Sequence, residues 1–148
     1  MKDMSDHFQT MAWIMVISGF LSTMNVWADS LHHVRFSVND VYMVTLMTGW
    51  MLTIMGLYYR YFVGLSVGIL LVASSLYAIR TQLFVSETEF LRGMIPHHSM
   101  AIHMSKRMRE KPNTIPSLLD EIITSQEKEI LYMNQKLRVG NKFNNRES

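Results

Sequence analysis

The first half of the sequence contains three long apolar runs, and the second half contains two segments with helical periodicity. The runs cover residues 8–28, 41–59 and 62–79, and none of them contains Asp, Glu, Lys or Arg. The length of each run is close to that of a transmembrane α-helix, which needs about 20 residues to cross a bilayer. We therefore expect three transmembrane helices. A cleaved signal peptide is the alternative for the first run, but the nearly neutral start MKDMSDH and the lack of a small-x-small cleavage site favour a retained helix.

Beyond the third run the chain reads as an amphipathic helical hairpin. Ser86-Glu-Thr-Glu89 has the S-x-x-E form of a capping box and predicts a helix over about residues 86–110. A turn at 111–114 and Pro116, a favoured first-turn proline, predict a second helix that ends near Val139, because Gly140 is a natural C-terminal stop.

The expected class is thus all-α, with two regions and a tail. A transmembrane region covers residues 1–83, a soluble metal-binding hairpin covers 84–139, and a flexible tail covers 140–148. Because two helices cannot bury both of their sides, we expect two hairpins to pair into a four-helix bundle, making the protein a dimer or a higher homo-oligomer.

Charge and composition narrow the class of function. Eleven of the fourteen Lys and Arg residues lie in residues 80–148, yet the net charge is only +2, which does not favour a nucleic-acid partner. The absence of cysteine excludes disulfides, thiolate zinc sites and a cysteine nucleophile. Fourteen methionines are unusual for 148 residues; Met is usually an apolar filler, but its thioether also binds soft metal ions.

Adjacent histidines mark the first predicted soluble helix. His97 and His98 directly follow Pro96, and Met94 lies one turn earlier. Proline inside a helix removes one backbone bond, so we expect a kink or local widening that aims the two histidines. Imidazole beside thioether is a combination that copper favours. We expect His103 to be exposed to solvent on the opposite side.

An antiparallel hairpin brings a second set of residues to the histidines. The wheel of the second helix places a glutamine at the centre of an apolar stripe and a glutamate at its edge. Folding about the turn puts His97 opposite Glu129, and Met94 near Met133. The predicted metal ligands are His97, His98, Met94, Met133, Glu129 and Gln126, with Glu87 and Met104 as outer or second-layer residues.

Two features of the apolar runs allow two interpretations each. Methionines recur every four residues and form one stripe on a helix: Met43, Met47, Met51 and Met55. The stripe is either a packing face against a neighbouring helix, which we favour, or a thioether surface for Cu(I). The Gly64-Leu-Ser-Val-Gly68 segment is a small-xxx-small pattern that serves either packing within the three spans or dimerisation.

Loop charges predict the orientation. Lys2 precedes the first run and Arg60 lies in the short second loop, whereas Arg35 in the first loop is accompanied by Asp29 and Asp40. Basic loops stay in the cytoplasm, so the N-terminus is expected inside and the C-terminal hairpin outside.

The hairpin resembles a bacterial family called domain of unknown function 305. Its M-I-x-H-H motif stands here as Met94-Ile-Pro-His97-His98, and its Q-x-x-E-I-x-x-M motif as Gln126-Glu-Lys-Glu129-Ile-Leu-Tyr-Met133. The linker His33-Val-Arg-Phe-Ser37 with Tyr42-Met43 is similar to a membrane-embedded subgroup with three spans. The resemblance implies a ferritin-like, self-associating helical fold and, for some soluble members, periplasmic copper binding.

The leading hypothesis is a non-enzymatic, membrane-anchored protein that binds copper, as Cu(I), or Ag(I), for buffering, tolerance or transfer. Another metal remains open. The expected place is a bacterial inner membrane, with the lipid bilayer, a copper exporter or a copper chaperone as partners. The alternatives are an oligomerising structural membrane module without metal, in which the histidines bond to Gln126 and Glu129, and a ferritin-like di-metal oxidase. The oxidase is disfavoured because the hairpin lacks a Glu-x-x-His pair.

Overall fold

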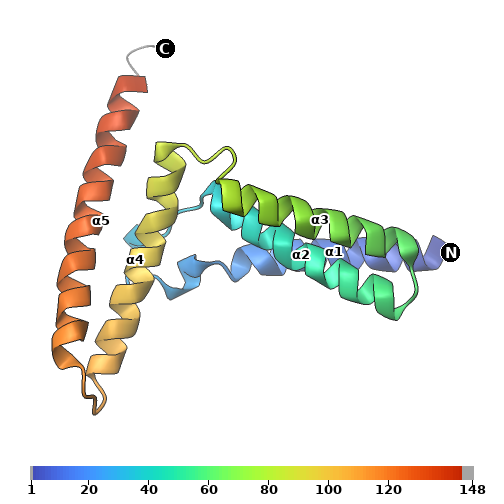
Figure 1. Ribbon diagram of the computed structural model, residues 1–148. Helices are drawn as coiled ribbons and strands as arrows, with labels where there is room; N and C mark the ends of the chain where they lie inside the picture. Colours follow the sequence, from blue (N-terminus) through green and yellow to red (C-terminus); the bar gives the residue numbers. More distant parts are fainter. Residues whose placement is uncertain (1, 145–148) are drawn as a thin grey trace. The chain divides into compact units, whose positions relative to one another are not determined.

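The chain is built from helices alone throughout residues 2–144, the part that the computed structural model describes (Figure 1). Side chains are described for residues 6–139. This confirms the predicted all-α class. In chain order, the elements are α1 (Lys2–Leu21), η1 (Met24–Trp27), η2 (Leu31–His33), α2 (Val38–Tyr58), α3 (Phe62–Thr81), α4 (Glu87–Arg109) and α5 (Pro116–Asn144).

The chain divides into two compact units. The first contains residues 1–23 and 38–85, and the second contains residues 24–37 together with the chain from Ser86 onward. The sequence boundary between residues 83 and 84 separates the same helices. The linker at 24–37, however, belongs to the second unit, whereas the sequence analysis grouped it with the transmembrane region.

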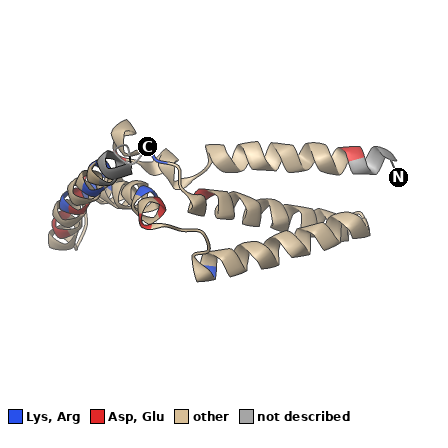
Figure 2. Cartoon of the chain, turned by 90° about the horizontal axis from the view of Figure 1, so that it is seen from above, with Lys and Arg blue, Asp and Glu red and all other residues tan. Residues whose placement is uncertain are grey.

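Three helical segments among the described residues are long and apolar enough to cross a membrane, and apart from residues 24–27 they belong to the first unit. They are Asp6–Trp27, Val38–Tyr58 and Phe62–Thr81, within three residues of the predicted starts. Figure 2 shows almost no charged residue on α1, α2 and α3, whereas acidic and basic residues are frequent on α4 and α5. A helix surface with almost no charge is compatible with the interior of a bilayer, whereas the charged surfaces of α4 and α5 are not.

Glycines set the closest helix contact in the first unit. A methyl group on Gly68 of α3 would lie 2.5 Å from the backbone nitrogen of Thr53 in α2, and one on Gly64 would lie 2.7 Å from the Phe8 ring of α1. The small-xxx-small segment therefore serves packing within this unit. The face of α2 that is buried consists of Asp40, Val44, Thr48, Gly49, Leu52 and Gly56.

The methionine stripe is not part of that buried face. Met43 is 48% exposed and Met47 is 42% exposed, while Met51 and Met55 are half-buried. Met43 and Met47 thus leave much of their side-chain surface uncovered within the first unit, whereas Met51 and Met55 are partly covered.

The second unit is built on the antiparallel helices α4 and α5, which lie side by side in Figure 1. The Ser86 side chain accepts a hydrogen bond from the Glu89 backbone N–H, which confirms the predicted start of α4. The core between the helices contains Ile95, Ile102, Ile130 and Met133, with Leu91, Met94 and Leu137 packed against it.

Two local expectations were wrong or incomplete. The second helix does not stop at Gly140 but continues to Asn144, since a glycine inside a helix costs only about 1 kcal/mol relative to alanine. Residues 140–144 of the predicted flexible tail are thus helical, and residues 145–148 lie outside the described part. At Pro96 the chain remains α-helical from Glu87 to Arg109, so the missing backbone bond does not divide α4 or widen it into another helix type.

Candidate metal site

His98 is the residue that connects the two helices of the hairpin. Its ring is largely buried, with Nδ1 2.8 Å from the Met94 carbonyl oxygen and Nε2 2.6 Å from Oε2 of Glu129. A carbonyl oxygen only accepts, so Nδ1 carries the hydrogen. Oε2 of Glu129 also accepts only, so the 2.6 Å contact is a hydrogen bond with a proton between Nε2 and the carboxylate.

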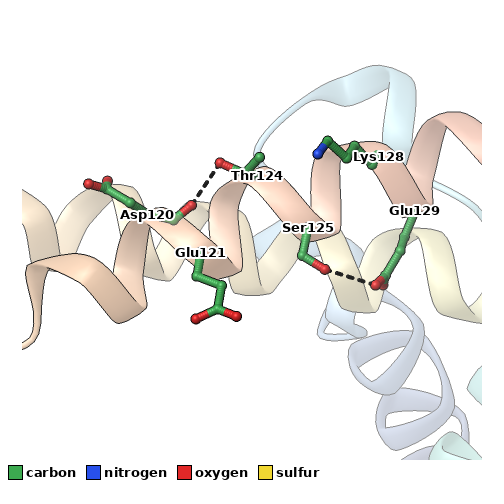
Figure 3. Close-up of a pocket in the computed structure, with 6 residues that line it drawn as sticks. All are labelled: Asp120, Glu121, Thr124, Ser125, Lys128 and Glu129. Atoms are coloured by element: carbon green, nitrogen blue, oxygen red, sulfur yellow. Dashed lines mark hydrogen bonds between the residues drawn. The ribbon is translucent and has the colours of Figure 1, made fainter.

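Glu129 is held in place from its own helix. The Ser125 hydroxyl donates to Oε1 of Glu129 at 3.0 Å, as Figure 3 shows, which leaves Oε2 for His98. The Glu129 side chain is 49% exposed. It lines an open groove of about 580 Å³ whose described lining residues all belong to α5: Asp120, Glu121, Thr124, Ser125, Lys128 and Glu129. An ion from solvent can therefore reach this carboxylate.

Two thioethers lie in the core of the same hairpin. Met133 is buried in the apolar cluster and Met94 packs against that cluster, as the antiparallel arrangement predicted. Met94 also supplies the carbonyl oxygen that orients His98. One imidazole, one carboxylate and two thioethers thus come from neighbouring turns of α4 and α5.

Gln126 has an unsatisfied polar atom. Its Oε1 is buried and has no hydrogen-bond partner among the described residues, one helical turn before Glu129. A buried amide oxygen without a partner is costly, typically about 1–3 kcal/mol, so this position calls for a donor or a cation. The observation fits the sequence expectation that Gln126 needs a ligand or a partner.

His97 does not occupy the position that the sequence analysis gave it. The prediction placed His97 opposite Glu129, but His98 makes that contact and His97 is exposed, with the two rings 5.9 Å apart at an interplanar angle of 66°. Adjacent residues on an α-helix point about 100° apart, and His98, not His97, lies on the buried face of α4.

The two expected outer residues do not approach this group of side chains. Glu87 is exposed in the first turn of α4, eleven residues before His98, a separation of about 16 Å along the helix axis. Met104 is also exposed. His103, expected to face solvent, is instead half-buried, with Nδ1 3.8 Å from Oδ1 of Asp29.

Ser99 is a structural centre that the sequence analysis missed. It is fully buried on α4, and its hydroxyl oxygen accepts the Asp29 backbone N–H at 2.8 Å and lies 2.9 Å from Nδ1 of His33. Burial lowers the pKa of His33, the largest effect on this ring, although Asp29 opposes it. A neutral His33 accepts the Ser99 hydroxyl hydrogen through Nδ1, which leaves Nε2–H as its free donor.

Asp29 fixes the same linker to α4 by charge. Its Oδ2 lies 2.7 Å from Nζ of Lys106, and this hydrogen bond raises the pKa of Lys106. The only sequence signal for this docking was a small polar residue, Ser99, on the buried side of an amphipathic helix. A small polar residue at this position does not indicate that its partner is Asp29, seventy residues earlier.

One hairpin offers few nitrogen and oxygen atoms that could coordinate a metal ion. Among residues 6–139, no group of three or more His, Cys, Asp or Glu side chains is arranged to hold a metal ion. Methionine sulfur and amide oxygen are outside that set. A single hairpin therefore offers His98 and Glu129 as a pair, with Met94, Met133 and Gln126 as the remaining donors.

Comparison with known proteins identifies the family. The family model described as "Domain of unknown function (DUF305)" matches residues 73–137. The protein is also 44% identical over 128 residues to "Uncharacterized protein L153" of Acanthamoeba polyphaga mimivirus, which covers 82% of this chain and 84% of the viral protein. No solved structure matches. With a match across α4 and most of α5, and a relative similar over most of its length, this chain belongs to the family of domain of unknown function 305.

Proposed function

We propose that this protein is a membrane-anchored metal-binding protein that captures copper, as Cu(I), or Ag(I), at the α4–α5 hairpin for buffering, tolerance or transfer. The observation that carries the proposal is the 2.6 Å contact between Nε2 of His98 and Glu129. Because Nδ1 donates to the Met94 carbonyl, Nε2 is the nitrogen left for a metal ion, which would replace the proton between Nε2 and Glu129. Metal-binding histidines are commonly oriented by such a bond from their other nitrogen.

The chemistry of the donors supports copper over harder ions. Met94 and Met133 offer thioethers, which favour Cu(I) and Ag(I), while imidazole serves copper in either oxidation state. Gln126 would provide the amide oxygen that now lacks a partner, as a ligand or through a bound water. The resemblance to copper-binding members of the family points to the same ion.

Location and partners form part of the same proposal. The three apolar helical segments cross a bacterial inner membrane, with the hairpin on the outer side, where a copper exporter or a chaperone would exchange the ion. Two copies pair their hairpins into a four-helix bundle. Large apolar side chains that remain exposed on α4 and α5 support this association: Phe90, Met104, Leu118, Leu131 and Tyr132.

The test is a metal titration of the full chain in detergent with Cu(I), Ag(I), Zn(II) and Fe(II). We expect stoichiometric Cu(I) binding that weakens about 10- to 100-fold in Glu129→Gln, the range found when a partner of a metal-binding histidine is removed, and at least as much in His98→Ala. His97→Ala is the matched control, because His97 is an exposed neighbour of the same type. Equal losses in His97→Ala and His98→Ala, or no tight binding of any metal, would contradict the proposal.

The same titration separates the alternatives. If the His98–Glu129 contact is only a structural bond within an oligomerising module, His98→Ala lowers stability and no metal binds tightly. Fe(II) binding with oxygen consumption would favour a di-metal oxidase. That alternative has less support, because Glu87 lies about 16 Å from His98 along α4.

A further inference from the structure

A second polar pocket lies in the same unit, away from His98 and Glu129. It has a volume of about 510 Å³ and is formed by the linker on one side and the C-terminal half of α5 on the other. We call it the basic pocket. Its described lining residues are Leu31, His32, His33, Arg35, Leu131, Asn134, Gln135 and Arg138.

The lining of the basic pocket is rich in hydrogen-bond donors and has no acid. It combines two guanidinium groups, two imidazoles and two side-chain amides, and none of its described residues carries a carboxylate. Neither Arg35 nor Arg138 forms an ion pair with a carboxylate among residues 6–139. The neighbouring surface differs, since Lys106 and Arg109 each pair with an aspartate. An anion is therefore the complementary ligand.

Hydrogen bonds within the protein hold two of these donor residues, Arg35 and His33, in position. The Arg35 backbone N–H donates to Oδ1 of Asn25 at 2.8 Å, and one Arg35 guanidinium nitrogen donates to the Val34 carbonyl at 2.8 Å. His33 is fixed through Nδ1 by buried Ser99, which leaves its Nε2 for a ligand. Binding a ligand therefore requires little further loss of conformational entropy from these two side chains.

We propose that the basic pocket binds a phosphate group. A guanidinium matches two oxygens of a phosphate at once, and the His33 imidazole and the Asn134 amide add donors to the remaining oxygens. Two sources share this chemistry, free inorganic phosphate and a lipid phosphomonoester. The sequence supports the lipid source, because Arg35 stands three residues before Val38, where the second candidate span begins. This proposal does not depend on the metal site.

The experiment uses the full chain purified in an uncharged detergent. Inorganic phosphate is titrated and followed by calorimetry, and phosphatidic acid is titrated against phosphatidylcholine and counted by native mass spectrometry. The variants are Arg35→Gln, Arg138→Gln and the double substitution. Arg107→Gln is the matched control, because it removes one guanidinium from the same unit at a residue paired with Glu110 outside the pocket.

We expect each single variant to lose roughly 10- to 100-fold in affinity, the effect of one charge-assisted hydrogen-bonding group, and the control to lose none. Arg138→Lys should lose less than Arg138→Gln, because the charge remains while the bidentate geometry is lost. Loss of inorganic phosphate binding in the double variant supports a free-phosphate site. Loss of phosphatidic acid binding alone supports a lipid site.

Three outcomes would overturn the proposal. They are no binding of either ligand, binding that the double variant leaves unchanged, and an equal loss in Arg107→Gln. An unchanged helical circular-dichroism spectrum and unfolding temperature of the double variant show that the chain is folded. This control needs no bound metal, so failure of the phosphate site and failure of the proposed metal site are distinguishable.

Discussion

Ser99 shows how one side chain can determine the course of a whole segment. Its hydroxyl is bonded to the Asp29 backbone and to His33, both in the linker, and no part of it is exposed. A buried hydroxyl that serves two partners fixes geometry more strictly than an apolar contact would, because each partner loses a bond if it moves.

Replacing Ser99 by alanine should release the linker from α4. The Asp29 N–H and the His33 ring would each lose a partner, at a combined cost of about 1–3 kcal/mol, so amide hydrogen exchange over residues 24–37 should accelerate in the full chain. Ser105→Ala is the control, since Ser105 is also buried on α4 but has no bond to the linker among the described contacts. Equal acceleration in both variants would show that Ser99 acts only through packing.

His97 and His98 illustrate a second point at the residue scale. Adjacent residues on a helix point about 100° apart, so only one of the pair can face α5. His98 does so and bonds to Glu129, while His97 is exposed.

At the scale of elements, glycines allow α2 and α3 to pack backbone against backbone. Gly49, Gly56 and Gly68 allow the two backbones to approach, and a Cβ at Gly56 or Gly68 would meet backbone atoms of the other helix. In a bilayer, where apolar burial does not drive helices together, such close packing provides much of the association energy.

Gly68→Ala should therefore destabilise the first unit. The new methyl group would lie 2.5 Å from the Thr53 backbone nitrogen, and overpacking of this kind costs about 1–3 kcal/mol. Thermal unfolding in detergent measures the effect. Gly19→Ala is the matched control, because the three atoms nearest to its methyl group all belong to the Val44 side chain, the first at 2.9 Å, and none is a backbone atom. A larger loss in Gly19→Ala would contradict this account.

The hairpin owes its stability to a different principle. Ile95, Ile102, Ile130 and Met133 are almost fully buried between α4 and α5, although each helix also carries exposed apolar residues on its other side. The proline in α4 removes one bond without ending the helix, because the buried contacts on either side of it hold the backbone in place.

At the scale of the whole molecule, the sequence of spans determines where the hairpin lies. In the proposed topology, three crossings from a cytoplasmic N-terminus would put the chain after α3 on the outer side. A chain with only two crossings, after removal of the first segment, would keep the hairpin on the outer side only if α2 began outside, because two crossings return the chain to the side on which they start.

Reporter fusions test this orientation. Alkaline phosphatase fused after Ser148 should be active and a fluorescent protein at the same place should be dark, because the first matures outside the cytoplasm and the second inside it. A fusion after Tyr61, in the loop between α2 and α3, should give the reverse pattern and serves as the control. A C-terminal fusion that fluoresces would overturn the proposed topology.

Local sequence patterns predicted most of the elements. The apolar runs marked the three spans, Ser86 and Pro116 marked the starts of α4 and α5, and the period of the apolar positions marked the faces that pack. These features depend on interactions within one or two helical turns, and such interactions are visible as periodic patterns and capping residues in the sequence. The antiparallel pairing placed Met94 and Met133 at one apolar cluster, but it did not decide whether His97 or His98 meets Glu129.

Only the tertiary structure assigned the linker to its unit. Asp29 and Ser99 are seventy residues apart, and no periodicity relates them. Likewise, the basic pocket combines Arg35 with Arg138, two bases that look like ordinary surface charges when each is seen in its own segment. Contacts between distant segments follow from how faces pack in three dimensions. The sequence by itself therefore determined the helices and one half of each site, whereas packing decided which residues from elsewhere complete them.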